Sequence, residues 1–330
     1  MEGLMEIKRF DNKDLQEVLA LFNEAIMNNE TIYKLLNEET FRTLFCEEKT
    51  NIIPIIMIGM EDGKIIGFAA GNTSVQLDKA YITYVGVDKE YRRNGYGRQL
   101  LKELEKSLKE VNQAIIKYEI LFFNPTNLVW LIPETPGHDH PNAPGIDMQS
   151  SAYLFFKNMG YRDFAYQNVY YLELKNYTLP ANMETILKQL EERELTITTY
   201  QPDLHYGFDE LFNNLDNENW RTVITENISK SNGGNPVLIL EHKGKICGFT
   251  GPLDVQKSGR GYFAGIGIHG DYRGGGAGKV LFASLCIGLK EMGAEFMTLF
   301  TGENNPARNI YEAAGFKIVK SFADMRKEIK

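Results

Sequence analysis

The sequence predicts an α/β protein built from two tandem copies of one unit. Segments rich in β-forming residues alternate with segments in which apolar residues recur at helical spacing. Two stretches share the spacing Arg-x-x-Gly-x-Gly, namely Arg92–Gly97 and Arg273–Gly278. A helix pattern ending in Gly and an aromatic residue also occurs twice, at 152–161 and 307–316. Together these observations indicate a duplicated strand, glycine-rich loop and helix.

Length and composition agree with two soluble domains. The chain has 330 residues, enough for about two hydrophobic cores. Its net charge of −8 argues against binding to nucleic acid, which needs a basic surface. Three widely spaced cysteines predict neither a disulfide nor a metal site. No signal-peptide pattern opens the chain and no apolar segment is long enough to span a membrane, so we expect a cytoplasmic protein.

The expected elements of the first copy follow from periodicity and turn residues. Asp11 is placed to cap a helix, and Glu61–Lys64 has the residues of a hairpin turn. Apolar side chains after the first glycine loop recur every three or four positions up to Val111, which predicts a helix. The expected strands are 4–10, 52–60, 65–71, 80–87, 118–123 and 166–174, and the other expected helices are 15–22, 38–48 and 150–159.

The second copy has the same order of elements after a joint at 175–195 with a linking helix at 183–192. The expected strands are 195–200, 237–241, 246–252, 262–268, 295–300 and a last stretch to the C-terminus, and the expected helices are 204–215, 219–229, one after the second glycine loop and one from about 306. The predicted domains are therefore 1–175, with a loop insertion at 124–149, and 195–330, joined by a linker helix at 176–194.

One register relates the two copies. The hairpin Gly63–Phe68 matches Gly244–Phe249, an offset of 181 positions. The same offset carries Val87 to Ile268 and Arg92 to Arg273. Between the helix patterns, from Ala152 to Ala307, the offset is 155, and the difference of 26 is the length of the insertion. The residues that match in this one register are those that shape turns and loops, so the repeat is not a coincidence.

Each glycine-rich loop is suited to an anion. Glycines let a ligand approach the backbone, and the first amides of the following helix favour a phosphate. The pattern Gly265-x-Gly267-x-x-Gly270 fits a dinucleotide fingerprint by letter but lies within an apolar strand, so we reject it. A Walker loop is also rejected, because Arg273 stands where its first glycine is required and Val280 follows Lys279.

On these motifs the chain resembles the GNAT superfamily of N-acetyltransferases, in particular its tandem two-domain members. The family's acyl-CoA motif stands here as Arg92–Gly97 and Arg273–Gly278, and its second motif as Asn305 followed by Ala307–Phe316. The resemblance covers nearly the whole chain except the linker and the insertion. It implies the fold class α/β (α+β), with two tandem GNAT-like domains, each a mixed, twisted, mostly antiparallel sheet flanked by helices.

The resemblance also implies the coenzyme A site. The pyrophosphate of acetyl-CoA is expected on the glycine-loop amides, and pantetheine between two separated strands. In the second copy the implied coenzyme-binding residues are Ile268, Arg273, Gly274, Gly275, Gly276, Ala277, Gly278, Lys279 and Asn305. In the first copy they are Val87, Arg92, Arg93, Asn94, Gly95, Tyr96, Gly97 and Arg98.

The two copies differ at the catalytic position that the resemblance implies. Tyr311 matches the family's general acid, which protonates the departing thiolate of coenzyme A, whereas the first copy has Phe156 there. We therefore expect the C-terminal copy to be the catalyst. The reverse case stays open, with an acceptor pocket built by Trp130, His138 and His140 of the insertion and with Tyr153 replacing the missing tyrosine. The His138–His140 segment lacks the partners that a metal site needs, so no metal is predicted.

The predicted function is transfer of acetyl from acetyl-CoA to a primary amine of a small molecule or peptide. The general base is not determined, and Glu241, Asp254 and Glu303 are candidates beside a water relay. A non-catalytic acyl-CoA-binding or regulatory protein is the alternative, and a nucleotide-phosphate-binding module is a second one. The sequence leaves the oligomeric state open, and a monomer is compatible with it because two tandem copies can pair with each other.

Overall fold

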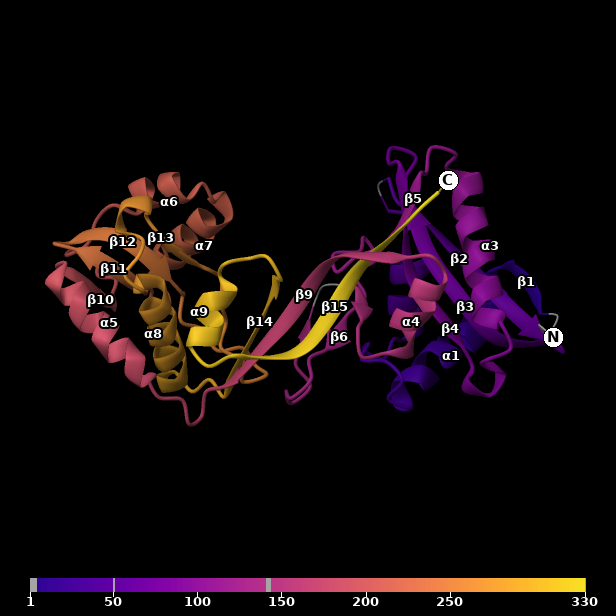
Figure 1. Cartoon of the computed structure of the whole chain (residues 1–330), viewed down its shortest axis with the longest axis horizontal. Coiled ribbons are helices and arrows are strands. Elements are labelled where there is room, and N and C mark those ends of the chain that lie inside the picture. Colours follow the sequence, from indigo (N-terminus) through magenta and orange to yellow (C-terminus); the bar gives the residue numbers. More distant parts are fainter. Residues whose placement is uncertain (1–4, 50, 141–143, 330) are drawn as a thin grey trace. The chain divides into compact units, whose positions relative to one another are not determined.

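The computed structural model of the chain describes residues 5–49, 51–140 and 144–329. It divides into two compact units, which we describe separately (Figure 1). Unit 1 takes in the described residues of 1–133, 137–167 and 321–330, and unit 2 those of 134–136 and 168–320. Both units combine a sheet with flanking helices, which confirms the predicted α/β class.

The sheet of unit 1 is mixed and mostly antiparallel. Its strands run in the order β1-β2-β3-β4-β5, followed by part of β15. Among the strand pairs described from β1 to β5 and between β5 and β15, the pair β4–β5 is the parallel one, because helix α3 connects these two strands. The bounds are β1 Glu6–Arg9, β2 Ile53–Glu61, β3 Lys64–Thr73, β4 Lys79–Val87, β5 Lys117–Ile120 and β15 Lys317–Glu328.

Helices cover both faces of this sheet. Successive side chains of β2 point to opposite faces and are apolar on both, so both faces have to be buried. Ile55 and Met57 pack with α3 (Tyr96–Val111), whereas Ile56 and Ile58 pack with α1 (Leu15–Met27). The α1 face is completed by α2 (Glu38–Phe41), the π-helical turn Arg42–Cys46 and the 3₁₀ turn Asn12–Asp14. Unit 1 also contains α4 (Ser151–Asn158), whose Phe156 joins the α3 core.

Unit 2 repeats this arrangement around a smaller sheet in the order β10-β11-β12-β13. Helix α8 packs with β14 and α9, and helices α6 and α7 pack on β11 and β12. The bounds are α5 Ala181–Glu192, β10 Leu195–Thr199, α6 Phe208–Leu215, α7 Glu218–Ile228, β11 Leu238–His242, β12 Lys245–Thr250, β13 Ile266–Ile268, α8 Ala277–Glu291, β14 Phe296–Gly302 and α9 Arg308–Ala313. Strand β9 (Arg162–Glu173) contributes residues to both units.

Three predicted elements are shorter than expected. The strand expected at 262–268 is reduced to Ile266–Ile268, because the Tyr262 amide bonds to the Asp254 carbonyl instead of to β12. The helix expected at 204–215 begins only at Phe208, after Gly207 at φ 104°. The helix expected at 38–48 ends at Phe41 and continues as one π-helical turn.

The C-terminal residues complete the sheet of unit 1. In β15, Met325 pairs with Ile120 of β5 in antiparallel register. Two ion pairs to nearly buried carboxylates fix this strand: Arg326 Nε lies 2.6 Å from Glu119, and Lys327 Nζ lies 2.6 Å from Glu105. The domain boundaries proposed from the repeat assign all of 195–330 to the second copy, whereas the compact units group 321–330 with unit 1.

Asp324 is the buried carboxyl group of β15. Its Oδ1 accepts a hydrogen bond of 2.6 Å from the Phe122 amide, just after β5. The side chain is only 6% exposed, and burial raises the pKa of Asp324 to about 6. The ionised form is therefore destabilised in the folded protein.

We predict that Asp324→Asn makes the folded protein less sensitive to pH between 4 and 7. Because the folded pKa of Asp324 lies above its unfolded value, its stabilising contribution is complete below about pH 4 and is lost as the pH rises through 6. Asn keeps an acceptor for the Phe122 amide. Urea unfolding should therefore show that the unfolding free energy of Asp324→Asn rises relative to that of the wild type by about 2 kcal/mol between pH 4 and pH 7. The exposed control Asp203→Asn should follow the wild type, and a pH-independent difference for Asp324→Asn would contradict the prediction.

Candidate functional site

The first glycine loop joins β4 to α3 in unit 1. Strand β4 ends at Val87 and is followed by the 3₁₀ turn Lys89–Tyr91. Arg93 and Gly95 then have φ angles of 69° and 84°, and α3 begins directly after Gly95. Arg92 Nε donates a 2.7 Å hydrogen bond to the Val87 carbonyl. This bond fixes the loop to the end of the strand.

The second glycine loop repeats this geometry in unit 2. Arg273 Nε donates a 2.9 Å hydrogen bond to the Ile268 carbonyl, which is the same bond at the offset of 181. The 3₁₀ turn Gly270–Tyr272 precedes the loop, and Gly276 at φ 82° precedes α8. Gly274 and Gly275 also have positive φ angles, of 87° and 59°. The predicted strand, glycine turn and helix are therefore present in both units.

The amides of both loops are available to a ligand. Within the described part of the chain, no hydrogen bond is formed by the backbone N–H groups of Arg93, Asn94 and Gly95, nor by those of Gly274–Gly276. Each set lies at the start of a helix of 15 or more residues, where the helix dipole adds positive potential. Exposed Arg273 and partly exposed Lys279 add charge in unit 2. Such a turn is suited to phosphate groups.

The other predicted loop residues have structural contacts. The Tyr96 hydroxyl donates to Glu61, and Asn94 Nδ2 donates to the Tyr91 carbonyl at 3.3 Å. Gly97 and Gly278 lie in the first turns of their helices, Arg98 is an exposed residue of α3, and Ala277 is buried as the first residue of α8. These contacts hold the loops in place without using their free amides.

The strands beside each loop separate. In unit 1, β4 pairs with β5 only from Lys79 to Tyr81, although β4 continues to Val87. In unit 2, a single parallel bridge joins Arg260 to Phe296, and β13 forms the edge of its sheet. The backbone of each strand therefore has an edge next to the glycine loop that the neighbouring strand does not pair. An extended chain with amide groups could bond there.

Asn305 forms a tight turn before α9, since its Oδ1 accepts from the Ala307 amide at 3.0 Å. Asn124 forms the same turn in unit 1, with Oδ1 accepting from the Thr126 amide at 2.9 Å. The prediction from the sequence did not include Asn124. The signal was present, since Asn124-Pro125 and Asn305-Pro306 also stand 181 positions apart. The insertion therefore begins only after this Asn-Pro pair.

Asn124 belongs to a buried polar cluster of unit 1 that the described residues of unit 2 do not repeat. Asn72 Nδ2 donates to Asn124 and Thr126, and Asn124 Nδ2 donates to the Ile82 carbonyl of β4. At the position of Asn72 the repeat has Leu253, which packs in the apolar core of unit 2. The side chains beside the gap between the strands are therefore polar in unit 1 and apolar in unit 2.

Tyr311 lies on α9 in an aromatic environment. Its ring centroid is 5.1 Å from that of Phe282, 5.9 Å from that of Tyr170 and 6.1 Å from that of Phe263. Tyr311 is 6% exposed, and burial, with a smaller effect of Tyr170, raises the pKa of its hydroxyl to about 12. The hydroxyl is therefore protonated at neutral pH and can act as a proton donor.

Unit 1 has no tyrosine at this place. Phe156 is buried between Phe155 and Tyr161 in the core beneath α3. Tyr153, the suggested replacement, donates a 2.6 Å hydrogen bond to Asp163 and also accepts from Lys157. Its hydroxyl is thus held by charged neighbours in this structure.

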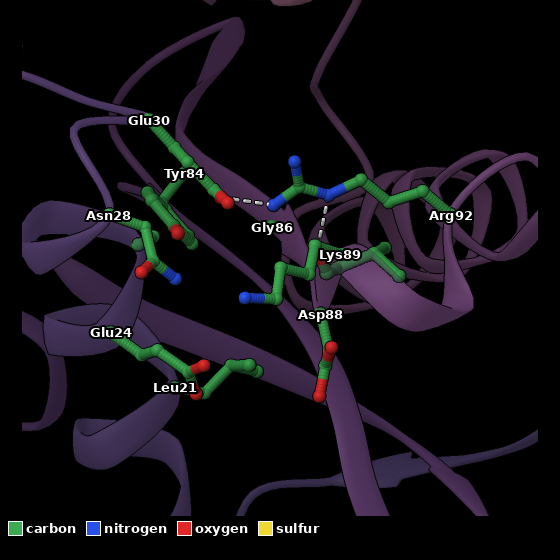
Figure 2. A pocket seen from close by; sticks show the side chains of 11 residues that line it. Leu21, Glu24, Asn28, Glu30, Tyr84, Gly86, Asp88, Lys89 and Arg92 are labelled. Atoms are coloured by element: carbon green, nitrogen blue, oxygen red, sulfur yellow. Dashed lines mark hydrogen bonds and ion pairs between the residues drawn. The ribbon is translucent and has the colours of Figure 1, made fainter.

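A hollow opens next to the first glycine loop (Figure 2). The hollow is shallow: its cavity volume is about 20 Å³, and the space around it is open to solvent. The end of α1, the end of β4 and the start of the loop form its walls. Its lining residues are Leu21, Glu24, Ala25, Asn28, Glu30, Tyr84, Gly86, Val87, Asp88, Lys89 and Arg92. The hollow therefore shares Val87 and Arg92 with the predicted coenzyme site.

Side chains occupy the corresponding place in unit 2. The offset of 181 puts Gly265 and Gly267 where unit 1 has Tyr84 and Gly86. A Cβ atom at Gly265 would lie 2.3 Å from Trp220 Nε1, and one at Gly267 would lie 2.4 Å from Leu215 Cδ1. Glycine is therefore required because Trp220 and Leu215 pack directly on this strand.

The insertion binds the segment after α1 but does not line the hollow with its predicted residues. Trp130 is fully buried, 5.0 Å from the ring of Phe322, and bridges to Tyr33. The half-buried His138 accepts a hydrogen bond from the Ile132 amide with its carbonyl. Of His140 the structure describes only the backbone, which pairs with Trp130. These pairs form the short strands β6 (Trp130–Leu131) and β7 (Asp139–His140), which precede β8 (Ile146–Asp147).

Two of the three candidate bases are engaged or exposed, and the third, Glu303, is partly buried. Glu241 accepts a 2.6 Å hydrogen bond from the Gly244 amide in the hairpin turn, and Asp254 is exposed. The described residues contain no group of three or more His, Cys, Asp or Glu side chains that could hold a metal ion. Likewise, none of the helices in the described segments is both long and apolar enough to cross a membrane.

Comparison with known proteins identifies related sequences and folds. The family model described as "Acetyltransferase (GNAT) family" matches residues 19–126 and 191–316. An acetyltransferase from Yersinia pestis (strain Pestoides F) is 28% identical over 141 residues, which are 38% of this chain and 93% of that protein.

Two solved structures share the fold at low identity. One is a tandem GNAT protein from the clavulanic acid biosynthesis pathway, with a TM-score of 0.50, 15% identity and 98% of each chain covered. The other is a fungal multi-domain β-N-acetylglucosaminidase with a GCN5-related glucosamine N-acetyltransferase region, with a TM-score of 0.56 and 16% identity. The match covers 98% of this chain but only 38% of the fungal protein.

We predict that Gly276→Ala destabilises unit 2 more than Gly274→Ala does. Both residues have positive φ angles, so either substitution costs about 1 kcal/mol of unfolding free energy. A Cβ at Gly276 would also lie 2.9 Å from two side-chain atoms of Ile186, whereas one at Gly274 meets nothing within 4 Å. We expect about 1 kcal/mol of additional loss for Gly276→Ala in urea unfolding. Equal losses for the two variants would contradict this packing argument.

Proposed function

The chain belongs to the GNAT family of acetyltransferases, and we propose that it transfers acetyl from acetyl-CoA to a primary amine of its acceptor. The observation that supports this most is the duplicated glycine loop, with free amides at a helix start and the same arginine-to-strand hydrogen bond in both units. Acetyl-CoA supplies an activated thioester, and the amine displaces the thiol of coenzyme A directly. The family match and the N-acetyltransferase relatives support the reaction class.

The proposed coenzyme site uses the loop amides and their flanking side chains. In unit 2 the amides of Gly274–Gly276 would face the pyrophosphate, with Arg273 and Lys279 adding positive charge. In unit 1 the amides of 93–95 and Arg92 would do the same. The unpaired strand edges at the ends of β4 and β13 would bond the amides of pantetheine. Asn305, and by the repeat Asn124, would flank it.

We propose Tyr311 as the general acid. Its raised pKa keeps the proton on the hydroxyl until a thiolate forms nearby. Phe156 cannot donate a proton, so the C-terminal unit is the better-equipped catalyst. The insertion with Trp130, His138 and His140 would act on an acceptor in unit 1 through the segment that it binds.

The alternative function is binding of acyl-CoA without catalysis, and Phe156 favours it for unit 1. Acetyl-CoA incubated with the whole chain and a panel of primary amines, with detection of free thiol, discriminates the two functions. Amine-dependent thiol release supports the transferase. Tight binding of acetyl-CoA without thiol release for any amine in the panel favours the alternative. A thermal shift with ATP but none with coenzyme A would contradict both.

We predict that Tyr311→Phe lowers kcat of acetyl transfer by about 100-fold, because general acid catalysis contributes at least this much. Its affinity for coenzyme A should stay within about twofold of the wild type, since the ring and its aromatic neighbours remain. Steady-state kinetics and calorimetric titration measure the two quantities. The matched control is Tyr170→Phe, which removes a hydroxyl bonded to Glu312 beside Tyr311 and should retain most of the activity. Full turnover by Tyr311→Phe would refute the assignment.

A further inference from the structure

One ion pair connects the first glycine loop with the hollow beside it. Arg92 donates through Nε to Val87 and through its terminal nitrogen to Glu30, which follows α1 (Figure 2). The side chain of Arg92 is 44% exposed and that of Glu30 is 24% exposed. The positive charge of Arg92, which directly precedes the free amides of this loop, is therefore neutralised by a carboxylate that lines the hollow.

The second loop lacks this neutralising partner. Arg273 keeps the bond to the carbonyl at the strand end, but within the described chain it forms no ion pair with an Asp or Glu. An arriving pyrophosphate therefore has to displace a carboxylate from Arg92 in unit 1 and none from Arg273 in unit 2. The two loops, otherwise alike in backbone, should differ in affinity for coenzyme A.

The segment that carries Glu30 is held by the insertion. The Leu131 amide donates to Ile32 at 2.8 Å, the Lys34 amide donates to Val129 at 2.9 Å, and Lys34 Nζ pairs with Asp139 at 2.6 Å. Tyr33 of this segment packs on the rings of Phe22 and Tyr84. Glu30 thus has a limited range of positions, between Arg92 and the hollow.

The charges that line the hollow favour a bound cation once Arg92 has left Glu30 for the pyrophosphate. Asp88 is paired with Lys64 at 3.3 Å. Without Arg92, the carboxylates of Glu24 and Glu30 remain in the lining with a single cation, Lys89. The ring of Tyr84 adds an aromatic wall, which attracts ammonium groups.

We propose that this hollow binds an organic ammonium group and that Glu30 is exchanged between this ammonium and Arg92 when coenzyme A binds to unit 1. The proposal rests on the proposed function, because it requires the coenzyme at the first loop. Each ligand removes the competitor of the other: the pyrophosphate takes Arg92 from Glu30, and the ammonium takes Glu30 from Arg92. Binding of amine and coenzyme is therefore mutually favourable, and the coupling is equal in both directions.

The test is a calorimetric titration of coenzyme A into the full chain, with and without excess ethylamine as the probe. We expect two classes of site, of which ethylamine tightens the weaker by about threefold to fivefold, the range for an exposed ion pair. Glu30→Gln should tighten the same class by a similar factor without ethylamine and abolish the effect of ethylamine. Arg273→Ala should weaken only the other class.

The matched control is Glu38→Gln, which breaks another exposed Glu–Arg pair of unit 1, to Arg42, away from the hollow. It should bind coenzyme A and respond to ethylamine as the wild type does. Wild-type affinity of Glu30→Gln at both classes, or an unchanged ethylamine effect in that variant, would overturn the proposal. A wild-type chain that binds no coenzyme A at all would contradict the proposed function itself, so the two failures are distinguishable.

Discussion

Both units depend on a helix that begins directly after a residue in the left-handed conformation. Gly95 and Gly276 take φ angles of 84° and 82°, which cost other residues about 1 kcal/mol or more. This sharp entry leaves the amides before the helix without partners, and the arginine bond to the strand end keeps the turn closed. The free amides, the positive end of the helix dipole and the unpaired strand edge therefore lie at one place in each unit. The remaining strands and helices of the unit hold these three groups in position.

The sequence was informative where local geometry restricts residue type. The glycine turns, the hairpins and the helices α3 and α8 could be predicted, because φ > 0 favours Gly and an amphipathic helix requires a periodic apolar face. The pairing of β15 with β5 could not, since it depends on contacts such as Arg326 with Glu119, which are 207 positions apart. No local pattern distinguishes such a strand from one that stays with its own repeat. The shortened β13 has a similar cause, because the Tyr262 amide bonds to Asp254 and no local pattern in 262–268 indicates that bond.

The same distinction applies to the site. The loop residues were found from spacing, whereas Asn124 was missed because the insertion follows it at once and hides the match with Asn305. The acceptor role of Trp130, expected from the position of the insertion, stays a prediction; in the structure its large apolar ring is buried against Phe322. Glu30 had no sequence signal, because its importance comes from a partner 62 positions away.

The asymmetry of the two units follows from which parts of the site are backbone and which are side chain. The amide cradle is made of backbone geometry, so neither copy can lose it without losing the turn that joins its sheet to its main helix. The proposed proton donor, the partner of the loop arginine and the wall facing the strand are single side chains, which can change without disturbing that turn. Accordingly, unit 2 has Tyr311 where unit 1 has Phe156. Arg273 forms no ion pair within the described chain, whereas Arg92 is bound to Glu30. At the strand, unit 2 has Gly265 covered by Trp220, whereas unit 1 has Tyr84 beside a hollow. The duplicated set of loop amides therefore allows two sites that bind the same part of a ligand, its phosphate groups. The side chains around the reactive end of that ligand differ between the two sites.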